Sequence, residues 1–214
     1  MNTLQWEFFP ALSIRPLKHG LSLRYPRDAD QIQNKENLLL KKSLKGIGLD
    51  KPIPIASAGQ PHGDNIAIIK GRDELYFPEA DGLLTCLPHI LLAIRVADCA
   101  ALYFYDPHTP AIGLIHSGKK GTNLQIPTKA VRAMNQAFGS KPADLIVQIS
   151  PCIRFPHYEI DFVSDIIDQL KSCGVEKIFD SGICTVCNLE RYFSYRAEKG
   201  NTGRMWAVLA LFPQ

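Results

Sequence analysis

The sequence lacks the segments that would direct a chain out of the cell or into a membrane. Met1–Glu7 holds no cationic start followed by an apolar core, so we expect no secretory signal. The longest apolar stretch, Ile90–Tyr105, is broken by Arg95 and Asp98 and cannot span a bilayer. The formal net charge is only +3, without a long basic run, which does not favour nucleic-acid binding. We therefore expect a cytoplasmic protein without a membrane or nucleic-acid partner; the sequence carries no signal for an oligomeric state.

Disulfide bonds are also not expected, although the chain has six cysteines. In a chain without an export signal, free thiols or metal ligands are the better interpretation of cysteine. Cys184 and Cys187 form a Cys-x-x-Cys pair, but no second pair and no thioredoxin-like strand–helix–strand pattern accompanies it. We interpret this pair as structural, with redox or zinc chemistry as the alternative.

The apolar patterns predict a fold that mixes strands and helices. A length of 214 residues suits a single domain over 1–214. Helices are expected over residues 28–47, 127–138, 162–173 and 189–196. Strands are expected over residues 65–69, 91–96, 100–105, 111–116, 144–149 and 205–211, with those of 91–116 in one sheet. Because the elements show no regular βαβ rhythm, we expect the α+β class, with mixed β-sheets flanked by helices.

Three short segments each place a potential metal ligand beside a strand-like run. The segments are Pro61–Gly63, Ala97–Cys99 and Ile115–Gly118. Two imidazoles and one thiolate, from His62, His116 and Cys99, suit Zn²⁺ and leave a fourth position for water or substrate. Their wide spacing is unlike that of a zinc finger, so the residues alone leave ordinary buried or surface side chains as an alternative.

Cys99 also admits a second chemistry. It would be the nucleophile, and His116 the base, of a cysteine hydrolase. Its neighbour Asp98 would either orient a ligand histidine through its carboxylate or cap a turn. Bound zinc would favour the metal site, and a metal-free protein with a reactive Cys99 would favour the hydrolase.

These segments and several others, in the same order, resemble the YfiH-like family, long described as laccase-domain or multicopper polyphenol oxidases. The matching segments are Gln60–Gly63, Ala80–Thr85, Leu92–Cys99, Ile115–Gly121, Ser150–Ile153, Tyr158–Ile160, Tyr192–Arg196 and Thr202–Met205. The chain is therefore identified as a member of this family over nearly its whole length.

The resemblance implies a fold, a metal and an activity. The family fold is α+β, and the positions of His62, Cys99 and His116 bind zinc. Its characterised members phosphorolyse adenosine, inosine and methylthioadenosine, and they also deaminate adenosine. We therefore expect a purine nucleoside and phosphate as small-molecule substrates and Zn²⁺ as the cofactor. Copper is less expected, because the chain has six histidines and no His-x-His pair for a trinuclear copper cluster.

Two departures from the family pattern concern the substrate pocket. The Trp-Arg pair that follows the last ligand is replaced by Lys119 and Lys120, and a loop that normally follows the segment 19–24 is missing. Lysine binds phosphate as a point charge, without the bidentate grip of arginine. The loss of an indole also removes a flat surface for a purine. A divergent paralogue that binds metal without catalysing is therefore an alternative.

The expected substrate-binding residues are Arg24, Lys119, Lys120 and Arg196. The expected catalytic residues are Asp64 and Lys120, with Glu159 as a further candidate for proton transfer.

Overall fold

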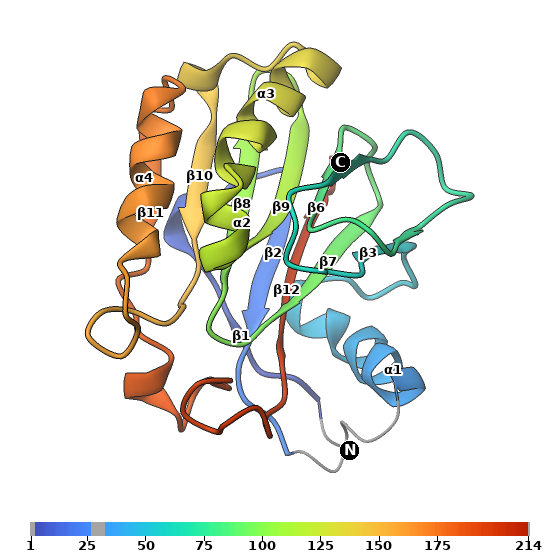
Figure 1. Cartoon of the computed structure of the whole chain (residues 1–214). Coiled ribbons are helices and arrows are strands. Elements are labelled where there is room, and N and C mark those ends of the chain that lie inside the picture. The colour runs from blue at the N-terminus through green and yellow to red at the C-terminus, as the bar shows by residue number, and fades with distance from the viewer. Residues whose placement is uncertain (1–2, 27–32, 214) are drawn as a thin grey trace.

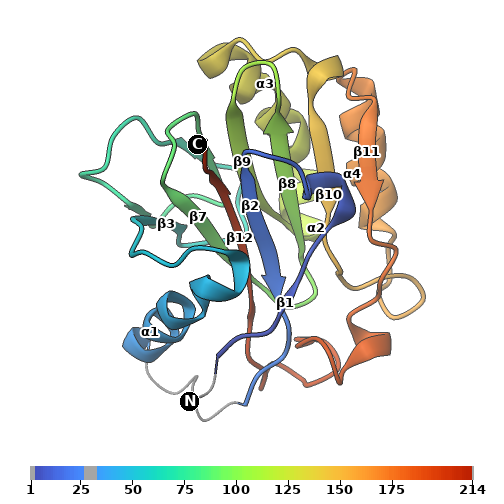
Figure 2. The same ribbon diagram turned by 180° about the vertical axis from the view of Figure 1, so that it is seen from behind.

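The strands form two mixed sheets in the computed structural model, which describes residues 3–26 and 33–213 (Figures 1 and 2). The first sheet has the order β1 (Trp6–Glu7), β2 (Leu17–Ser22), β12 (Met205–Leu211), β7 (Leu91–Val96), β3 (Ile55–Ala58) and β5 (Tyr76–Phe77). The second has the order β11 (Lys177–Asp180), β10 (Ile146–Ile149), β8 (Ala100–Asp106), β9 (Ala111–Ser117), β6 (Gly82–Thr85) and β4 (Ile66–Ile68). Both sheets contain parallel and antiparallel pairs, which confirms the expected α+β class.

The longer α-helices lie on the outside of the two sheets. The α-helices are α1 (Gln33–Ser43), α2 (Lys119–Asn123), α3 (Ile126–Phe138) and α4 (Phe162–Ser172). The 3-10 helices are η1 (Pro10–Leu12), η3 (Leu44–Ile47), η4 (Pro142–Asp144) and η5 (Val186–Asn188). Figure 1 shows α3 and α4 in front of the second sheet, and α1 lies beside the first. Among the described residues, no helix combines the length and the apolar character needed to cross a bilayer.

The second sheet is buried on both faces, and this positions one of the proposed ligands. Along β8, Tyr103 and Tyr105 pack against the first sheet, whereas Leu102 and Phe104 pack against α3 and α4. The sequence of such a strand is almost continuously apolar, because neither of its faces is exposed to solvent. The same alternation in β9 sends Leu114 toward the first sheet, so His116, two residues later, also faces the space between the sheets.

Most of the expected elements are confirmed within one or two residues, including the helices over 127–138 and 162–173. The helix expected over 28–47 begins outside the described residues; from Gln33 it runs to Ser43 and continues as η3.

The helix expected over 189–196 is wrong. This segment follows η5 as a series of turns and extended backbone. Tyr192 and Phe193 are both 0% exposed, and the backbone carbonyl of Arg191 accepts a hydrogen bond from Arg24 N–H at 2.7 Å. These long-range contacts override the helical preference of the segment.

The expectation that residues 91–116 belong to one sheet is also wrong in part. β8 and β9 are antiparallel neighbours, as expected, but β7 lies in the first sheet. The link 97–99 is therefore a crossover between sheets and not a hairpin. Both β7 and β8 are buried, so their sequences show no alternation that would separate the sheets.

Candidate metal centre

The topology of the two sheets brings the three proposed ligands to one end of the molecule. β3 and β7 are parallel neighbours, so their C-terminal ends coincide. From that end the chain crosses to the second sheet twice, through His62 after β3 and through Cys99 after β7. β9 runs antiparallel to β8 with Ser117 opposite Ala100, which brings His116 beside Cys99.

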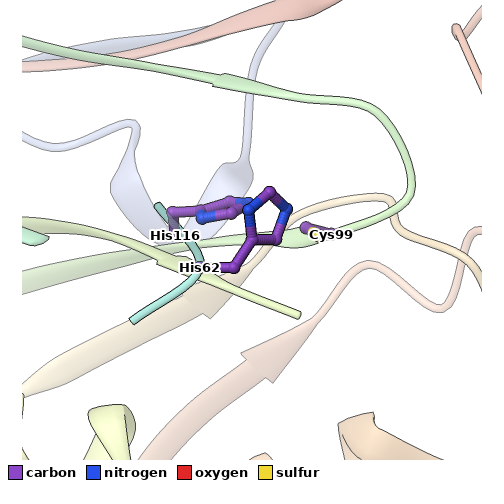
Figure 3. Close-up of side chains that lie close together, drawn as sticks. All are labelled: His62, Cys99 and His116. Atoms are coloured by element: carbon purple, nitrogen blue, oxygen red, sulfur yellow. The ribbon is translucent and has the colours of Figure 1, made fainter. Parts of the chain in front are cut away.

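The three side chains converge as a set of metal ligands (Figure 3). One ligand atom each from His62, Cys99 and His116 lies within 4.8 Å of the others. The two imidazole rings have centroids 4.8 Å apart and planes at 80°, so they meet edge to face without stacking. Both histidines are hydrogen-bonded to the Cys99 thiol. His62 is exposed, Cys99 half-buried and His116 buried, which leaves one side of the set accessible. Two nitrogens and a sulfur with an accessible side fit a catalytic zinc ion better than a closed structural site.

A buried carboxylate supports this set. Asp81 is 0% exposed and precedes β6. Its Oδ1 accepts hydrogen bonds from His116 Nδ1 at 2.8 Å and from His62 N–H at 3.0 Å. Its Oδ2 accepts a hydrogen bond from Gly63 N–H at 2.6 Å. The sequence contains this residue in the family-like segment 80–85, but nothing in its spacing indicates contact with both histidines.

The histidines strongly perturb the thiol. Burial opposes ionisation of Cys99, but hydrogen bonds to His116 and His62 and their positive charge outweigh it and lower its pKa to about 6. Burial likewise opposes protonation of His116, but Asp81 and Cys99 raise its pKa to about 9. Without metal, Cys99 and His116 therefore form a thiolate–imidazolium pair near neutral pH, and the thiolate is the form that binds zinc.

Asp98 does not contact a histidine in this way. Its Oδ1 accepts a hydrogen bond from Thr185 Oγ1 at 2.7 Å, and its Oδ2 accepts one from Arg196 N–H at 2.7 Å. Its backbone has a left-handed conformation with φ of 82°. Asp98 therefore ties the crossover to two later loops, and the carboxylate that contacts the ligand histidines is Asp81.

The ligand set opens into a pocket of about 1380 Å³. Lys119, Lys120 and Arg196 supply positive charge to its lining, and Tyr158 and Tyr195 supply aromatic rings. This combination of a metal-ligand set, cations and aromatic rings suits a small anionic co-substrate together with a planar organic group.

The Glu159 carboxylate partly neutralises the cations of the pocket. It contacts Arg196 Nη2 at 2.9 Å and Lys119 Nζ at 3.6 Å. The Arg196 guanidinium also lies over the Tyr158 ring, 4.9 Å from the ring centroid. These side chains are about half exposed, so the ion pairs are easily exchanged for contacts to an anion.

Two of the expected site residues, Arg24 and Asp64, are not among the residues that line this pocket. Arg24 forms an ion pair with Glu198 at 2.7 Å and packs over the Phe193 ring. Asp64 pairs with Lys129. The roles expected for Arg24 and Asp64 in substrate binding and catalysis stay predictions that this geometry does not support.

The cysteines of the chain are free thiols, and all six lie in the described part. Cys184 and Cys187 form no disulfide, and Cys152 is buried beside Cys184.

The chain shares its sequence pattern and fold with known proteins. The family model for multi-copper polyphenol oxidoreductase laccase matches residues 21–166 and 156–212. The purine nucleoside phosphorylase YlmD of Bacillus subtilis (strain 168) is 25% identical, and the match covers 91% of this chain and 82% of YlmD. A purine nucleoside phosphorylase of Clostridium acetobutylicum is 31% identical over 70% of this chain and 74% of its own length.

The crystal structure of YlmD from Geobacillus stearothermophilus is similar in fold. Its TM-score is 0.84 at 22% identity, and the match covers 96% of this chain and 94% of that one. At this identity the structural likeness concerns the fold alone.

Proposed function

Because the chain belongs to the multi-copper polyphenol oxidoreductase laccase family, we propose that it is a zinc-dependent purine nucleoside phosphorylase. The observation that carries this proposal is the convergence of His62, Cys99 and His116 at the wall of a pocket rich in cations. Relatives named purine nucleoside phosphorylases supply the substrate class. Adenosine, inosine and methylthioadenosine are the nucleosides to test first, and deamination of adenosine is a further activity of the same site.

The donor set supports zinc over copper as the cofactor. His62, Cys99 and His116 would hold the ion, and a trinuclear copper cluster would need more histidines than the described site provides. When bound, zinc supplies Lewis acidity toward phosphate or water.

The residues around the ligands would bind phosphate and the nucleoside. Lys119, Lys120 and Arg196 would hold the phosphate by charge at the pocket wall. One phosphate oxygen forms a bond to the anomeric carbon of the ribose while the glycosidic carbon–nitrogen bond breaks. The purine nitrogen takes up a proton, giving the free base and ribose 1-phosphate. The proton comes from a group at the pocket, for which Lys120 is our candidate.

The purine would stack on an aromatic ring of the pocket. Tyr195 is 55% exposed and lines the pocket, so its ring is accessible to a planar base. Its ring lies under the Arg204 guanidinium at 5.4 Å from the centroid, and both residues line the pocket. Tyr195 would therefore take the place of the family indole that Lys119 replaces.

One experiment tests both the metal and the reaction. The protein is purified without added zinc, its metal content is measured, and adenosine, inosine and methylthioadenosine are incubated with phosphate. We expect about one zinc per chain and release of base together with ribose 1-phosphate. Cys99→Ser should lose the zinc and reduce turnover by about two orders of magnitude or more. Cys86→Ser, which alters an exposed cysteine, is the matched control and should change neither.

The lowered pKa of Cys99 favours one alternative, a cysteine hydrolase with His116 as the base. A metal-free protein whose Cys99 is rapidly alkylated would favour this hydrolase. Bound zinc without turnover of any nucleoside would favour a metal-binding paralogue without catalytic activity.

A further inference from the structure

We propose that Asp81 is the positioning residue that fixes both histidine ligands of the metal centre. The inference rests on the proposed zinc site and adds to it a residue that determines how the site is assembled. The Asp81 side chain is fully buried, and each hydrogen bond it accepts comes from a ligand histidine or the residue next to one.

The contacts between Asp81 and His116 fix the orientation of one imidazole. The Asp81 backbone carbonyl accepts a hydrogen bond from His116 N–H at 2.7 Å, and the carboxylate contacts His116 Nδ1 at 2.8 Å. A carboxylate accepts, so the proton resides on Nδ1. The lone pair that faces a metal is therefore the one on Nε2, as in other carboxylate–histidine–metal arrangements.

The contacts between Asp81 and the loop before β4 fix the second histidine through its backbone. The backbone of His62 is left-handed with φ of 62°, a conformation that disfavours a residue with a Cβ. The Asp81 carboxylate accepts hydrogen bonds from the N–H groups of His62 and Gly63 at 3.0 and 2.6 Å. Two charge-assisted hydrogen bonds offset the unfavourable backbone and hold the side chain beside its partner ring.

An asparagine cannot replace this carboxylate. Three N–H groups converge on the two oxygens of Asp81, whereas a carboxamide offers one acceptor oxygen and two donor hydrogens. If the NH₂ group of the asparagine takes the place of Oδ2, it faces the Gly63 N–H, and two donors then point at each other. If the NH₂ group faces the histidines, it opposes His62 N–H and favours the tautomer of His116 that carries its proton on Nε2. Either orientation weakens the ligand set.

The test compares Asp81→Asn with the same change at a second buried aspartate, Asp106. Asp106 ends β8, whereas the ligand Cys99 precedes the start of that strand. Asp106 is 1% exposed, and its Oδ1 accepts hydrogen bonds from the N–H groups of His108 and Thr109 at 2.9 and 3.1 Å. Zinc affinity is measured for both variants and the unaltered protein by competition with a chromophoric chelator. We expect Asp81→Asn to weaken zinc binding by about 10- to 100-fold. Asp106→Asn keeps an oxygen that accepts both hydrogen bonds, and it should leave the zinc affinity within about twofold.

The outcomes separate this inference from the proposed function. If the unaltered protein and Asp81→Asn bind zinc equally tightly, Asp81 is not a positioning residue, although the zinc site stands. If the unaltered protein binds no zinc, the proposed function and this inference both fail. A weakened affinity in Asp81→Asn supports the inference even where no nucleoside is turned over.

A measurement on the unaltered protein keeps the proposal testable if Asp81→Asn does not fold. Long-range ¹H–¹⁵N spectra of the zinc-loaded protein report which nitrogen of His116 carries a proton. We expect a proton on Nδ1, protected from solvent exchange by Asp81, and none on Nε2. A proton on Nε2 would overturn the proposal.

Discussion

The side-chain amide of Gln60 pairs with both backbone groups of Arg95. Gln60 Nε2 donates to the Arg95 carbonyl at 2.7 Å, and Gln60 Oε1 accepts from Arg95 N–H at 2.8 Å. Gln60 lies two residues before His62, and Arg95 lies in β7 shortly before Cys99. One side chain therefore joins the two crossovers that carry these ligands. It does so just past the end of the β3–β7 pairing, whose last partners are Ser57 and Ala93.

We predict that Gln60→Glu separates the two crossovers. A glutamate keeps the size of the side chain but places a second acceptor opposite the Arg95 carbonyl. Loss of this hydrogen bond and the repulsion between acceptors should reduce the free energy of unfolding by about 1–3 kcal/mol. Urea denaturation measures this change, and zinc affinity should fall with it. Gln136→Glu, on the exposed side of α3, is the control and should leave the zinc affinity unchanged. An unaltered unfolding midpoint in Gln60→Glu would contradict the prediction.

The glycine after β9 leaves room for the thiolate. A Cβ built on Gly118 would lie 2.5 Å from Cys99 Sγ, which is closer than real contacts allow. We predict that Gly118→Ala displaces the sulfur and lowers zinc affinity by about tenfold or more, because ligand positions tolerate shifts of only about 0.5 Å.

Chelator competition measures the affinity of Gly118→Ala, and circular dichroism checks its fold. Gly71→Ala is the control, because a Cβ there meets nothing within 4 Å. Equal affinity of the Gly118→Ala variant and the unaltered protein would show that Cys99 moves freely and is not held at the site.

Away from the pocket, His19 should make stability depend on pH. It is 4% exposed, its Nε2 accepts a hydrogen bond from Phe9 N–H at 2.8 Å, and burial lowers its pKa from 6.5 to about 4. The unfolded chain binds the proton first as pH falls, so this stability is fully present above pH 6.5 and is lost as the pH falls through 4. The difference amounts to about 3 kcal/mol.

The variant His19→Gln tests this dependence, since glutamine keeps an acceptor but does not titrate. Unfolding free energies are measured from pH 7 to pH 4. The slope in this window should be smaller in His19→Gln than in the unaltered protein. His108→Gln, which changes an exposed histidine, should keep the slope. Equal slopes in all three proteins would show that His19 is protonated in the fold as easily as in the unfolded chain.

The sequence predicts individual elements better than their assembly. The runs 100–105 and 111–116 and the turn between them indicate two antiparallel strands, because strand length and turn residues are local properties. The assignment of β7 to the other sheet is not local. β7 is almost entirely buried, so its residues show no alternation that distinguishes a crossover at Asp98 from a hairpin.

The candidate site shows the same division. The resemblance indicates His62, Cys99 and His116, and the structure brings these ligand atoms together. Asp81 escapes prediction because its role comes from the register of β6 against β9, with Gly82 opposite Ile115. That register, which no short motif encodes, places the preceding carboxylate beside His116.

If the pocket binds phosphate as proposed, we expect Glu159 to compete with it for the cations of the pocket. Its carboxylate contacts Arg196 and Lys119, and these three side chains are about half exposed. A bound phosphate must replace these contacts, so removal of the carboxylate charge should favour binding. We predict that Glu159→Gln lowers the KM for phosphate by about two- to threefold and leaves kcat unchanged. The effect should shrink as ionic strength rises, because salt screens exposed charges.

Steady-state kinetics at several phosphate concentrations measure both constants for Glu159→Gln. Glu176→Gln, at an exposed position before β11, is the matched control and should change neither. A higher KM in Glu159→Gln would mean that Glu159 holds Arg196 and Lys119 in the productive arrangement. A lower kcat at saturating phosphate would instead assign Glu159 to proton transfer, because a charge that only competes with phosphate has no effect once phosphate fills the site.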